Sequence, residues 1–178
     1  KSTNNITGEK FQQTFNDSKM RNEKRIISHA RNDSSIDSVL GMDGKKYSIA
    51  DALDKKIDWI QIDIGFLTEP EKQTVLQKCK YSVINGSHTV MGEILGVNSK
   101  PLIGIPVYDE HTNNLKWAEE KNLGVLAKNK DQVILGIKKI KKNMNIFQES
   151  LEDFSNNFVF DGAVTTAKIV NEELDTKT

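Results

Sequence analysis

Short apolar runs alternate with longer stretches of helical periodicity between residues 57 and 142. The apolar runs predict strands over residues 57–64, 81–84, 101–105 and 124–127. The spacing of apolar positions between and after these runs predicts helices over residues 70–80, 89–95, 112–121 and 131–142. Two further helices, over about residues 146–154 and 162–173, are expected to close the chain.

The pattern is weaker before residue 57. Phe11 and Phe15 lie four positions apart, which places both on one face of a short helix. Residues 25–28, Arg-Ile-Ile-Ser, predict a strand, and residues 49–55 predict a brief helix. The segment 29–46 is rich in Gly, Asp, Asn and Ser, so it predicts a loop with turns.

Strands that alternate with helices of about ten residues indicate parallel βαβ units. The fold class we expect is therefore α/β, a doubly wound, Rossmann-like parallel sheet with helices on both faces. Residues 1–178 are expected to form a single domain, with 57–142 as its best-defined core and with 1–23 and 29–46 poorly defined. Ligands of such sheets bind outside the carboxyl ends of the strands, so the residues just after each strand are the candidates for function.

Composition excludes some classes of protein. The 178 residues carry 25 Lys and Arg against 25 Asp and Glu, so a general electrostatic grip on nucleic acid or on an anionic membrane is not expected, although a local basic patch is compatible with this balance. The single cysteine, Cys79, excludes an internal disulfide and a Cys-rich zinc site. Three scattered His residues show no metal-ligand spacing, so no metal site is expected. No apolar run approaches a membrane span and no signal peptide is visible, which favours a cytoplasmic location.

The most informative strand end is Asn-Gly-Ser-His-Thr-Val-Met-Gly-Glu, residues 85–93. Gly86 can adopt backbone angles closed to other residues and leaves room for a ligand. Ser87, His88 and Thr89 then open a helix, where unpaired N–H groups and the helix dipole favour an anion such as a diphosphate. The alternative is that Ser87 or Thr89 only caps this helix.

Two other strand ends carry polar groups or exposed backbone. Residues 106–114 include Glu110, His111 and Asn114, whose side chains could bond sugar hydroxyls; the alternative is a polar loop with a helix cap. The segment 65–69 could pair its backbone with the edge of a base beside Phe66 or Leu67, or could be an ordinary loop.

From Asp63 to Ala127 the chain resembles a known family. Lys-Tyr-Ser-Val-Ile-Asn-Gly-Ser-His-Thr-Val-Met-Gly-Glu, then Lys-Pro-Leu-Ile-Gly-Ile-Pro and Glu-His-Thr-Asn-Asn-Leu, are similar in order and spacing to the C-terminal, nucleotide-sugar-binding half of GT-B glycosyltransferases. The likeness is to the peptidoglycan N-acetylglucosaminyltransferase and UDP-glucuronosyltransferase group and its archaeal homologues. It implies that the chain is one half of a GT-B fold.

The resemblance also implies roles for individual residues. Gly86, Ser87, His88 and Thr89 occupy the place that holds the donor diphosphate, and Glu93 matches the glutamate that binds the ribose. For the donor sugar the matching positions are Glu110 and His111, with Asn114 helping to fix their loop. The loop at Phe66 and Leu67 resembles the one that contacts the uracil base. No metal or other cofactor is implied, and the donor would be a UDP-linked sugar.

This sequence also departs from the family pattern. Ser87 stands where the turn has a second glycine, and His111 stands where glutamine is usual, so the preferred donor sugar is open. The acceptor-binding N-terminal half, which usually supplies the catalytic base, is missing, so the catalytic residue is unknown. We therefore expect a donor-binding domain that works with such a half in cis or in trans. The alternatives are a non-catalytic or partner-dependent subunit, or a nucleotide-sugar 2-epimerase-like domain.

Lysine pairs at 138–139 and 141–142 mark one face of a predicted helix. The ordinary interpretation is a solvated face. The alternative is a basic patch that makes peripheral contact with an anionic membrane surface.

Overall fold

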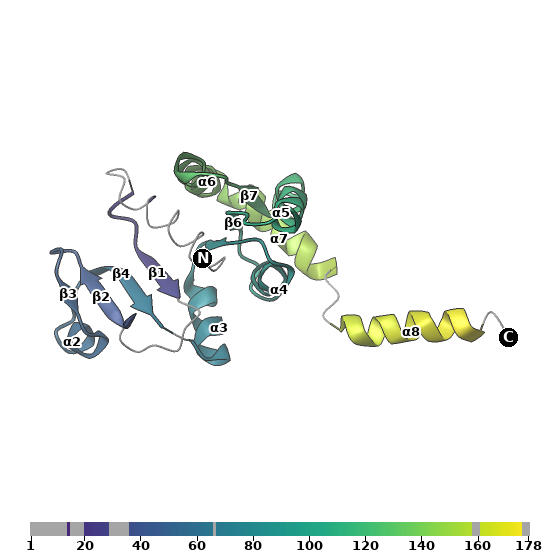
Figure 1. Ribbon diagram of the computed structural model, residues 1–178, viewed down its shortest axis with the longest axis horizontal. Coiled ribbons are helices and arrows are strands. Elements are labelled where there is room, and N and C mark those ends of the chain that lie inside the picture. Colours follow the sequence, from purple (N-terminus) through teal and green to yellow (C-terminus); the bar gives the residue numbers. More distant parts are fainter. Residues whose placement is uncertain (1–13, 15–19, 29–35, 66, 158–160, 176–178) are drawn as a thin grey trace.

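The computed structural model describes residues 14, 20–28, 36–65, 67–157 and 161–175, and its strands form two sheets (Figure 1). The first sheet has the order β1-β4-β2-β3. It contains β1 (Arg25–Ser28), β2 (Ser38–Gly41), β3 (Lys46–Tyr47) and β4 (Trp59–Ile64). The second has the order β5-β6-β7 and contains β5 (Ser82–Ile84), β6 (Leu102–Gly104) and β7 (Gly124–Leu126).

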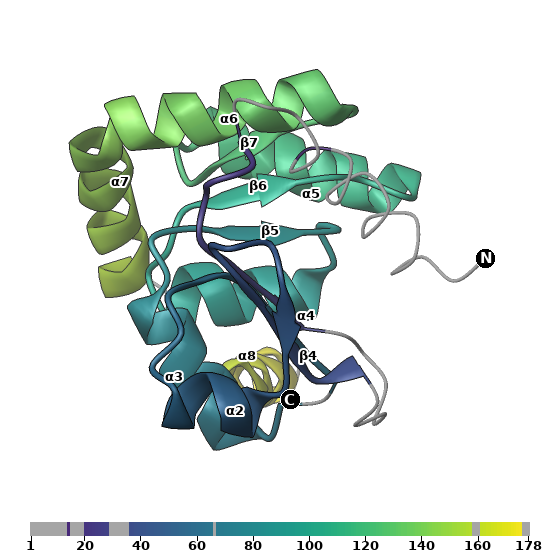
Figure 2. The same cartoon turned by 90° about the vertical axis from the view of Figure 1, so that its left-hand side faces the viewer.

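The second sheet has the expected parallel α/β architecture. Strand β6 pairs in parallel with both β5 and β7, and helices alternate with these strands along the chain (Figure 2). The helices are α3 (Glu69–Lys78), α4 (His88–Met91), η2 (Gly92–Val97, a π-helix), α5 (Asp109–Glu120), α6 (Lys130–Lys142) and α7 (Met144–Asn157). The predicted elements from residue 57 onward therefore match the structure to within a few residues.

The prediction of a plain loop over residues 29–46 is wrong for its second half. Strands β2 and β3 lie there, and β2 runs antiparallel to both β3 and β4. Val39, only 4% exposed, is the buried residue that the surrounding Gly, Asp and Ser residues obscured. The brief helix predicted at 49–55 is α2 (Ile49–Asp54), which Ser48 caps by accepting a hydrogen bond from the backbone N–H of Asp51. The helix expected around Phe11 and Phe15 lies outside the described residues.

Two clusters of buried side chains cover the opposite faces of the β5-β6-β7 sheet. Ile103 and Ile105 of the β6 segment pack with α6, whereas Leu102 packs with α4, η2 and α5. This alternation along one strand is the period of two that a sheet covered on both sides requires. Helices α4 and α5 therefore share one face, and α6 lies on the other.

The approach of α5 to β6 depends on Gly104. A Cβ atom at this position would lie 1.9 Å from Cδ2 of Leu115, a side chain with no exposed surface. Since buried Leu115 has no space to withdraw into without disturbing its neighbours, only glycine lets the helix approach the strand this closely.

Helix α8 (Gly162–Asp175) projects away from the rest of the fold (Figure 1). Its side chains Val164, Ile169 and Val170 are each half exposed or more. Within the part of the chain that the structure describes, no helix is long and apolar enough to cross a bilayer.

We expect Gly104→Ala to destabilise the fold by about 1–3 kcal/mol, because the added methyl group overlaps Leu115. The measurement is urea unfolding monitored by far-UV circular dichroism. Gly162→Ala is the matched control, since a Cβ atom there meets nothing within 4 Å. Equal stability of the two variants would show that α5 can move away from β6 at little cost.

Candidate functional site

The turn after β5 contains a glycine in the left-handed region and is closed by a side-chain hydrogen bond. Gly86 has φ +91°, in the region that favours glycine, and a Cβ atom there would lie 2.8 Å from Leu115. The side-chain oxygen of Asn85 accepts a hydrogen bond from the N–H of Ser87 at 3.1 Å. Ser87 is the N-cap residue of α4, yet its hydroxyl makes no capping hydrogen bond. Its position is therefore that of a cap, but its hydroxyl does not act as one.

Asn114 ties this turn to the start of α5. Its amide Nδ2 donates a hydrogen bond to the backbone oxygen of Gly86 at 3.1 Å, in a partly buried position. The next residue, Leu115, packs against Gly86. Gly86 and Asn114 are 28 residues apart in the sequence, and the turn and α5 are thus held together by one polar and one apolar contact.

His88 and Glu110 bring the two expected parts of the donor site into contact. Nδ1 of His88 lies 3.2 Å from Oε1 of Glu110, and the two side chains are 77% and 64% exposed. A pair this exposed contributes little to stability. Both groups are therefore accessible to a ligand at the carboxyl ends of β5 and β6.

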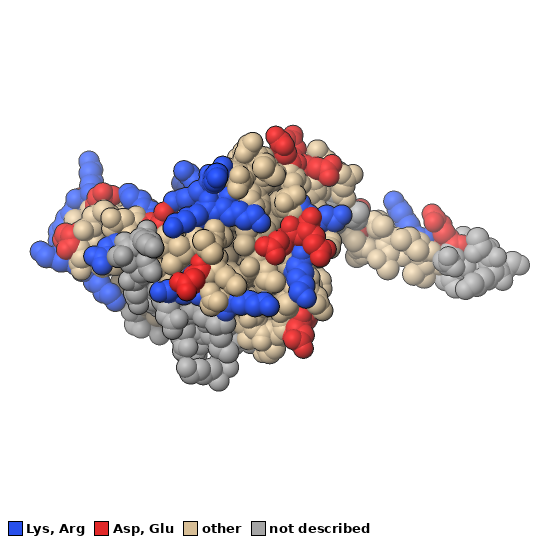
Figure 3. All heavy atoms as spheres, turned by 90° about the horizontal axis from the view of Figure 1, so that it is seen from above, with Lys and Arg blue, Asp and Glu red and all other residues tan. Residues whose placement is uncertain are grey.

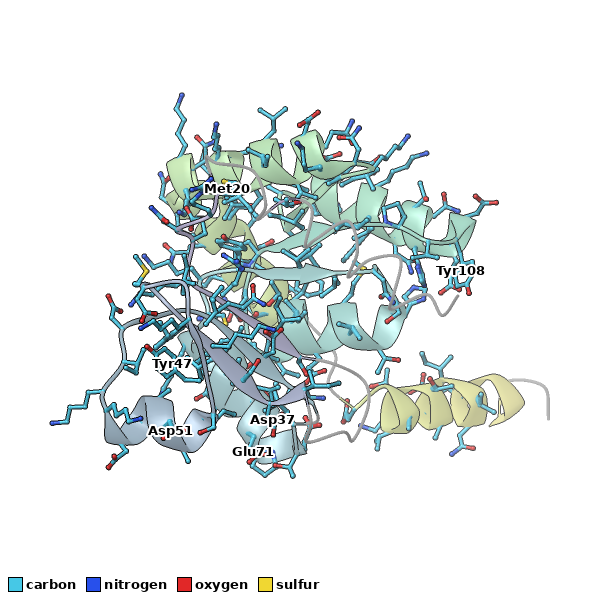
Figure 4. The ribbon with its side chains drawn as sticks, turned by 60° about the vertical axis from the view of Figure 1, so that its left-hand side comes forward. Met20, Asp37, Tyr47, Asp51, Glu71 and Tyr108 are labelled. Carbon is cyan, nitrogen blue, oxygen red and sulfur yellow. The ribbon has the colours of Figure 1, made fainter. Side chains whose placement is uncertain are left out.

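His111 lies in a different environment from the one a sugar contact requires. The residue is only 6% exposed, and its buried Nδ1 has no hydrogen-bond partner among the described residues. Its ring makes an edge contact with Tyr108, at 5.2 Å between centroids, and Tyr108 itself lies at the exposed edge of the fold (Figure 4). His111 lies in the first turn of α5, so a sugar could reach its ring only after this turn moves, and a direct contact stays a prediction.

Glu93 is held by two side chains of α3. Its Oε1 accepts from Nζ of Lys72 at 2.8 Å and from Nε2 of Gln73 at 3.1 Å, and the Glu93 side chain is 17% exposed. Lys72 also pairs with Glu69 at 2.8 Å. Hydrogen bonds to Glu69 and Glu93 raise the pKa of Lys72, so the ammonium stays charged.

The sequence did not mark Lys72 or Gln73 as part of the site. Both lie in a polar helix where charged residues are ordinary, and only the packing of α3 beside η2 brings them to Glu93. Asn98 completes the group, since its Nδ2 donates to Oε1 of Gln73 at 3.0 Å and to the backbone oxygen of Glu93 at 2.9 Å. Helix η2 starts at Gly92, and π-helices are frequent at functional sites.

The expected base-binding loop lies between β4 and α3. Phe66 is outside the described residues, and Leu67 is half-buried. The loop is fixed at both ends, because Asp37 accepts from the N–H of Gly65 at 2.8 Å and Glu71 accepts from the N–H of Thr68 at 2.8 Å. Figure 4 labels Asp37 and Glu71 at this end of the fold. Hydrogen bonds from Thr68 lower the pKa of Glu71, which keeps this carboxylate ionised.

A cavity of about 550 Å³ opens beside the turn, between α4, α5 and α7. Its walls are mainly apolar, and Trp117 meets Phe154 there in an edge contact at 5.7 Å between ring centroids. His88 and Asn114 also line it, so it adjoins the expected site. Trp117 is 41% exposed, so it forms a wall of this cavity rather than part of the core.

Other candidate groups show no reactive arrangement. Burial raises the pKa of the Cys79 thiol, which makes it a poorer nucleophile. Among the residues with a described placement, no cluster of three or more His, Cys, Asp or Glu side chains is arranged to hold a metal ion.

We expect Asn114→Ala to destabilise the fold by about 1–2 kcal/mol, because it leaves the partly buried Gly86 carbonyl without its donor. Asn113→Ala is the control, since Asn113 lines the same cavity but has no such bond; its effect should stay within about 0.5 kcal/mol. Urea unfolding of both variants provides the measurement. A similar loss in both would mean that general packing, not the amide, holds the turn to α5.

Comparison with known proteins shows which solved structures have a similar fold. No protein-family model and no curated protein matches the sequence. Among solved structures, the chain is similar to the glycotransferase of kitacinnamycin, with a TM-score of 0.56 and 10% identity over 85% of this chain and 34% of that one. It is also similar to the spinosyn forosaminyltransferase SpnP, with a TM-score of 0.47 and 14% identity over 75% of this chain and 39% of that one.

At such low identity the similarity concerns the fold alone. The chain spans about a third of the length of the kitacinnamycin glycotransferase, which corresponds to one domain. The chain therefore has the α/β fold of one half of a GT-B glycosyltransferase.

Proposed function

We propose that this chain is the donor-binding domain of a glycosyltransferase that moves a hexosyl group from a UDP-sugar to an acceptor. The observation that carries the proposal is the meeting of two strand ends at one edge of the parallel sheet. The bond from Asn114 to Gly86 and the contact between His88 and Glu110 join the turn after β5 to the start of α5. This edge is where open α/β sheets bind their ligands.

The diphosphate would lie on the turn and the start of α4. Helices α4 and η2 form one continuous helical segment from His88 to Val97. As at the start of any helix, the first backbone N–H groups of this segment have no partner within it. In this proposal the N–H groups from His88 onward bind the phosphate oxygens, and the imidazole of His88 adds a donor. The N–H of Ser87 would join them only by leaving the side-chain oxygen of Asn85. The same groups would stabilise the UDP leaving group as its charge develops.

The ribose would bind Glu93, as the resemblance implies. Lys72 and Gln73 both occupy Oε1, and no bond from a described residue reaches Oε2. A ribose hydroxyl could donate to Oε2 without displacing either side chain. Lys72 and Gln73 would then orient the carboxylate, and Leu67 would lie toward the base.

The donor sugar would lie beside Glu110, whose carboxylate is exposed at the start of α5. Asn114 would act by holding the loop rather than by touching the sugar, since its amide is bound to Gly86. His111 would contact the sugar only after a rearrangement of the first turn of α5. The identity of the sugar therefore depends on Glu110, His88 and the paired domain.

Catalysis would require the acceptor-binding half, in cis or in trans. Helix α8 offers a surface for such a paired half, because it projects from the fold and exposes Val164, Ile169 and Val170 (Figure 1). An isolated helix of about 14 residues is marginal in water, so a packing partner would stabilise it. Alone, the chain is expected to bind donor but to turn it over slowly or not at all.

We expect UDP to bind this chain and Glu93→Gln to weaken binding about 10- to 100-fold, the value of a hydrogen bond to a charged group. Calorimetric titration measures the affinity, and a melting-temperature shift checks it, since ligand at 100 times its dissociation constant adds about 2.7 kcal/mol.

Glu69→Gln is the matched control for this titration. It removes the other carboxylate bound to Lys72 and leaves Glu93 in place, so UDP affinity should stay near that of the parent chain. Equal UDP affinities for the parent chain, Glu93→Gln and Glu69→Gln would show that Glu93 does not bind UDP. An absence of any UDP binding would instead favour a non-catalytic domain.

The remaining alternative is a nucleotide-sugar 2-epimerase-like activity. Analysis of products from a UDP-sugar, with the paired half supplied, separates the two reactions. A transferase releases UDP and forms a glycoside, whereas an epimerase returns an altered sugar nucleotide.

A further inference from the structure

Positive charge is concentrated on α6. This helix carries Lys130, Lys138, Lys139, Lys141 and Lys142, with Asp131 as its only acidic residue, although the whole chain has no net charge. Figure 3 looks down onto this side of the molecule and shows Lys and Arg side chains gathered together there. The chain as a whole is therefore neutral, whereas this helix is strongly basic.

Among the described residues, three of these lysines on α6 have no neutralising partner. Lys138, Lys139 and Lys142 are exposed and form no ion pair with the described residues. Lys141 differs, because it pairs with Glu23 at the side of the helix. The three exposed ammonium groups are thus available to an anionic partner.

An apolar side chain lies among them. Leu135 is 63% exposed and precedes the three lysines by three, four and seven positions, which places all four on one face of the helix. The core face of α6 is formed by other residues, including Val133, Ile137 and Ile140. Leu135 therefore contributes little to the core, and its position is open to a surface that accepts both charge and an apolar group.

We propose that the outward face of α6, formed by Leu135, Lys138, Lys139 and Lys142, docks on an anionic lipid bilayer. The lysines would meet the lipid phosphates, and Leu135 would enter the boundary between headgroups and acyl chains. A soluble polyanion would use the lysines alone, whereas a bilayer also uses the leucine. This combination is the reason for assigning the face to a membrane surface.

The position of α6 makes this docking compatible with ligand binding elsewhere. Helices α4 and α5, with the turn at Gly86, pack on the opposite face of the β5-β6-β7 sheet. The inference does not rest on the proposed function, because it uses only the charges and exposure of α6.

The test is flotation of the full chain with vesicles of phosphatidylcholine and phosphatidylglycerol, compared with vesicles of phosphatidylcholine alone. We expect binding to the anionic vesicles only. The double variant K138E/K139E should weaken it by at least about 25-fold, at about fivefold for each lysine. L135S should weaken it by about tenfold, the value of a largely buried leucine.

K45E/K46E is the charge-matched control, because Lys45 and Lys46 are exposed at the first sheet, away from α6. It should bind vesicles like the parent chain, and an equal loss in this control would overturn the assignment to α6. Failure of the parent chain to bind anionic vesicles would also overturn it. One further pattern would overturn it: L135S binds anionic vesicles as tightly as the parent chain does, and the parent chain binds inorganic polyphosphate as tightly as it binds the vesicles. That pattern is expected of a face that binds a soluble polyanion.

Calorimetric titration of the same variants with UDP separates the two proposals. The α6 variants should keep the melting temperature of the parent chain and its response to UDP. Loss of vesicle binding with UDP binding unchanged would confirm that the α6 face acts separately from the donor site.

Discussion

The fold of this chain depends on one close contact, the packing of Leu115 against two glycines. Gly104 in β6 and Gly86 in the turn after β5 both lie where a Cβ atom would overlap the Leu115 side chain. Since Leu115 is fully buried, α5 can approach both strands only because neither position carries a side chain. The hydrogen bond from Asn114 to Gly86 then fixes the direction in which α5 leaves the sheet. The candidate site exists because this contact brings two separate strand ends to the same edge.

The second constraint is the covering of the β5-β6-β7 sheet on both faces. Alternate residues of β6 serve different clusters, so α4, η2 and α5 gather on one side and α6 on the other, while α7 contributes Phe147 to the α6 cluster and Leu151 to the opposite one. This division gives the two faces different chemistry. One face presents a glycine turn, carboxylates and an apolar cavity, and the other presents exposed lysines around an exposed leucine. A doubly wound sheet can therefore support a ligand site and a docking face without competition between them.

The carboxylate of Glu93, proposed to bind a ribose, is already hydrogen-bonded within the protein. Lys72 and Gln73 already bond to one of its oxygens, so part of its charge is neutralised before any ligand arrives. Holding the carboxylate in one orientation lowers the entropy lost on binding, at the cost of a weaker acceptor. Lys72 also bonds Glu69, so the cation that neutralises part of the Glu93 charge is itself held between two carboxylates.

The sequence by itself determined the strands and helices from residue 57 onward, because apolar runs in a doubly covered sheet and amphipathic helices are visible as patterns along the chain. It also marked Gly86 and Asn114, whose residue types match the positive φ and the amide bond that the structure contains. Strands β2 and β3 were hidden, since they are short and lie among turn-forming residues, and their pairing with β4 is a contact distant in sequence. Only the tertiary structure decided that His111 is buried while His88 reaches Glu110, and that Lys72 binds Glu93. Burial and pairing of polar side chains depend on which helices pack together, and no local pattern of residues carries that information.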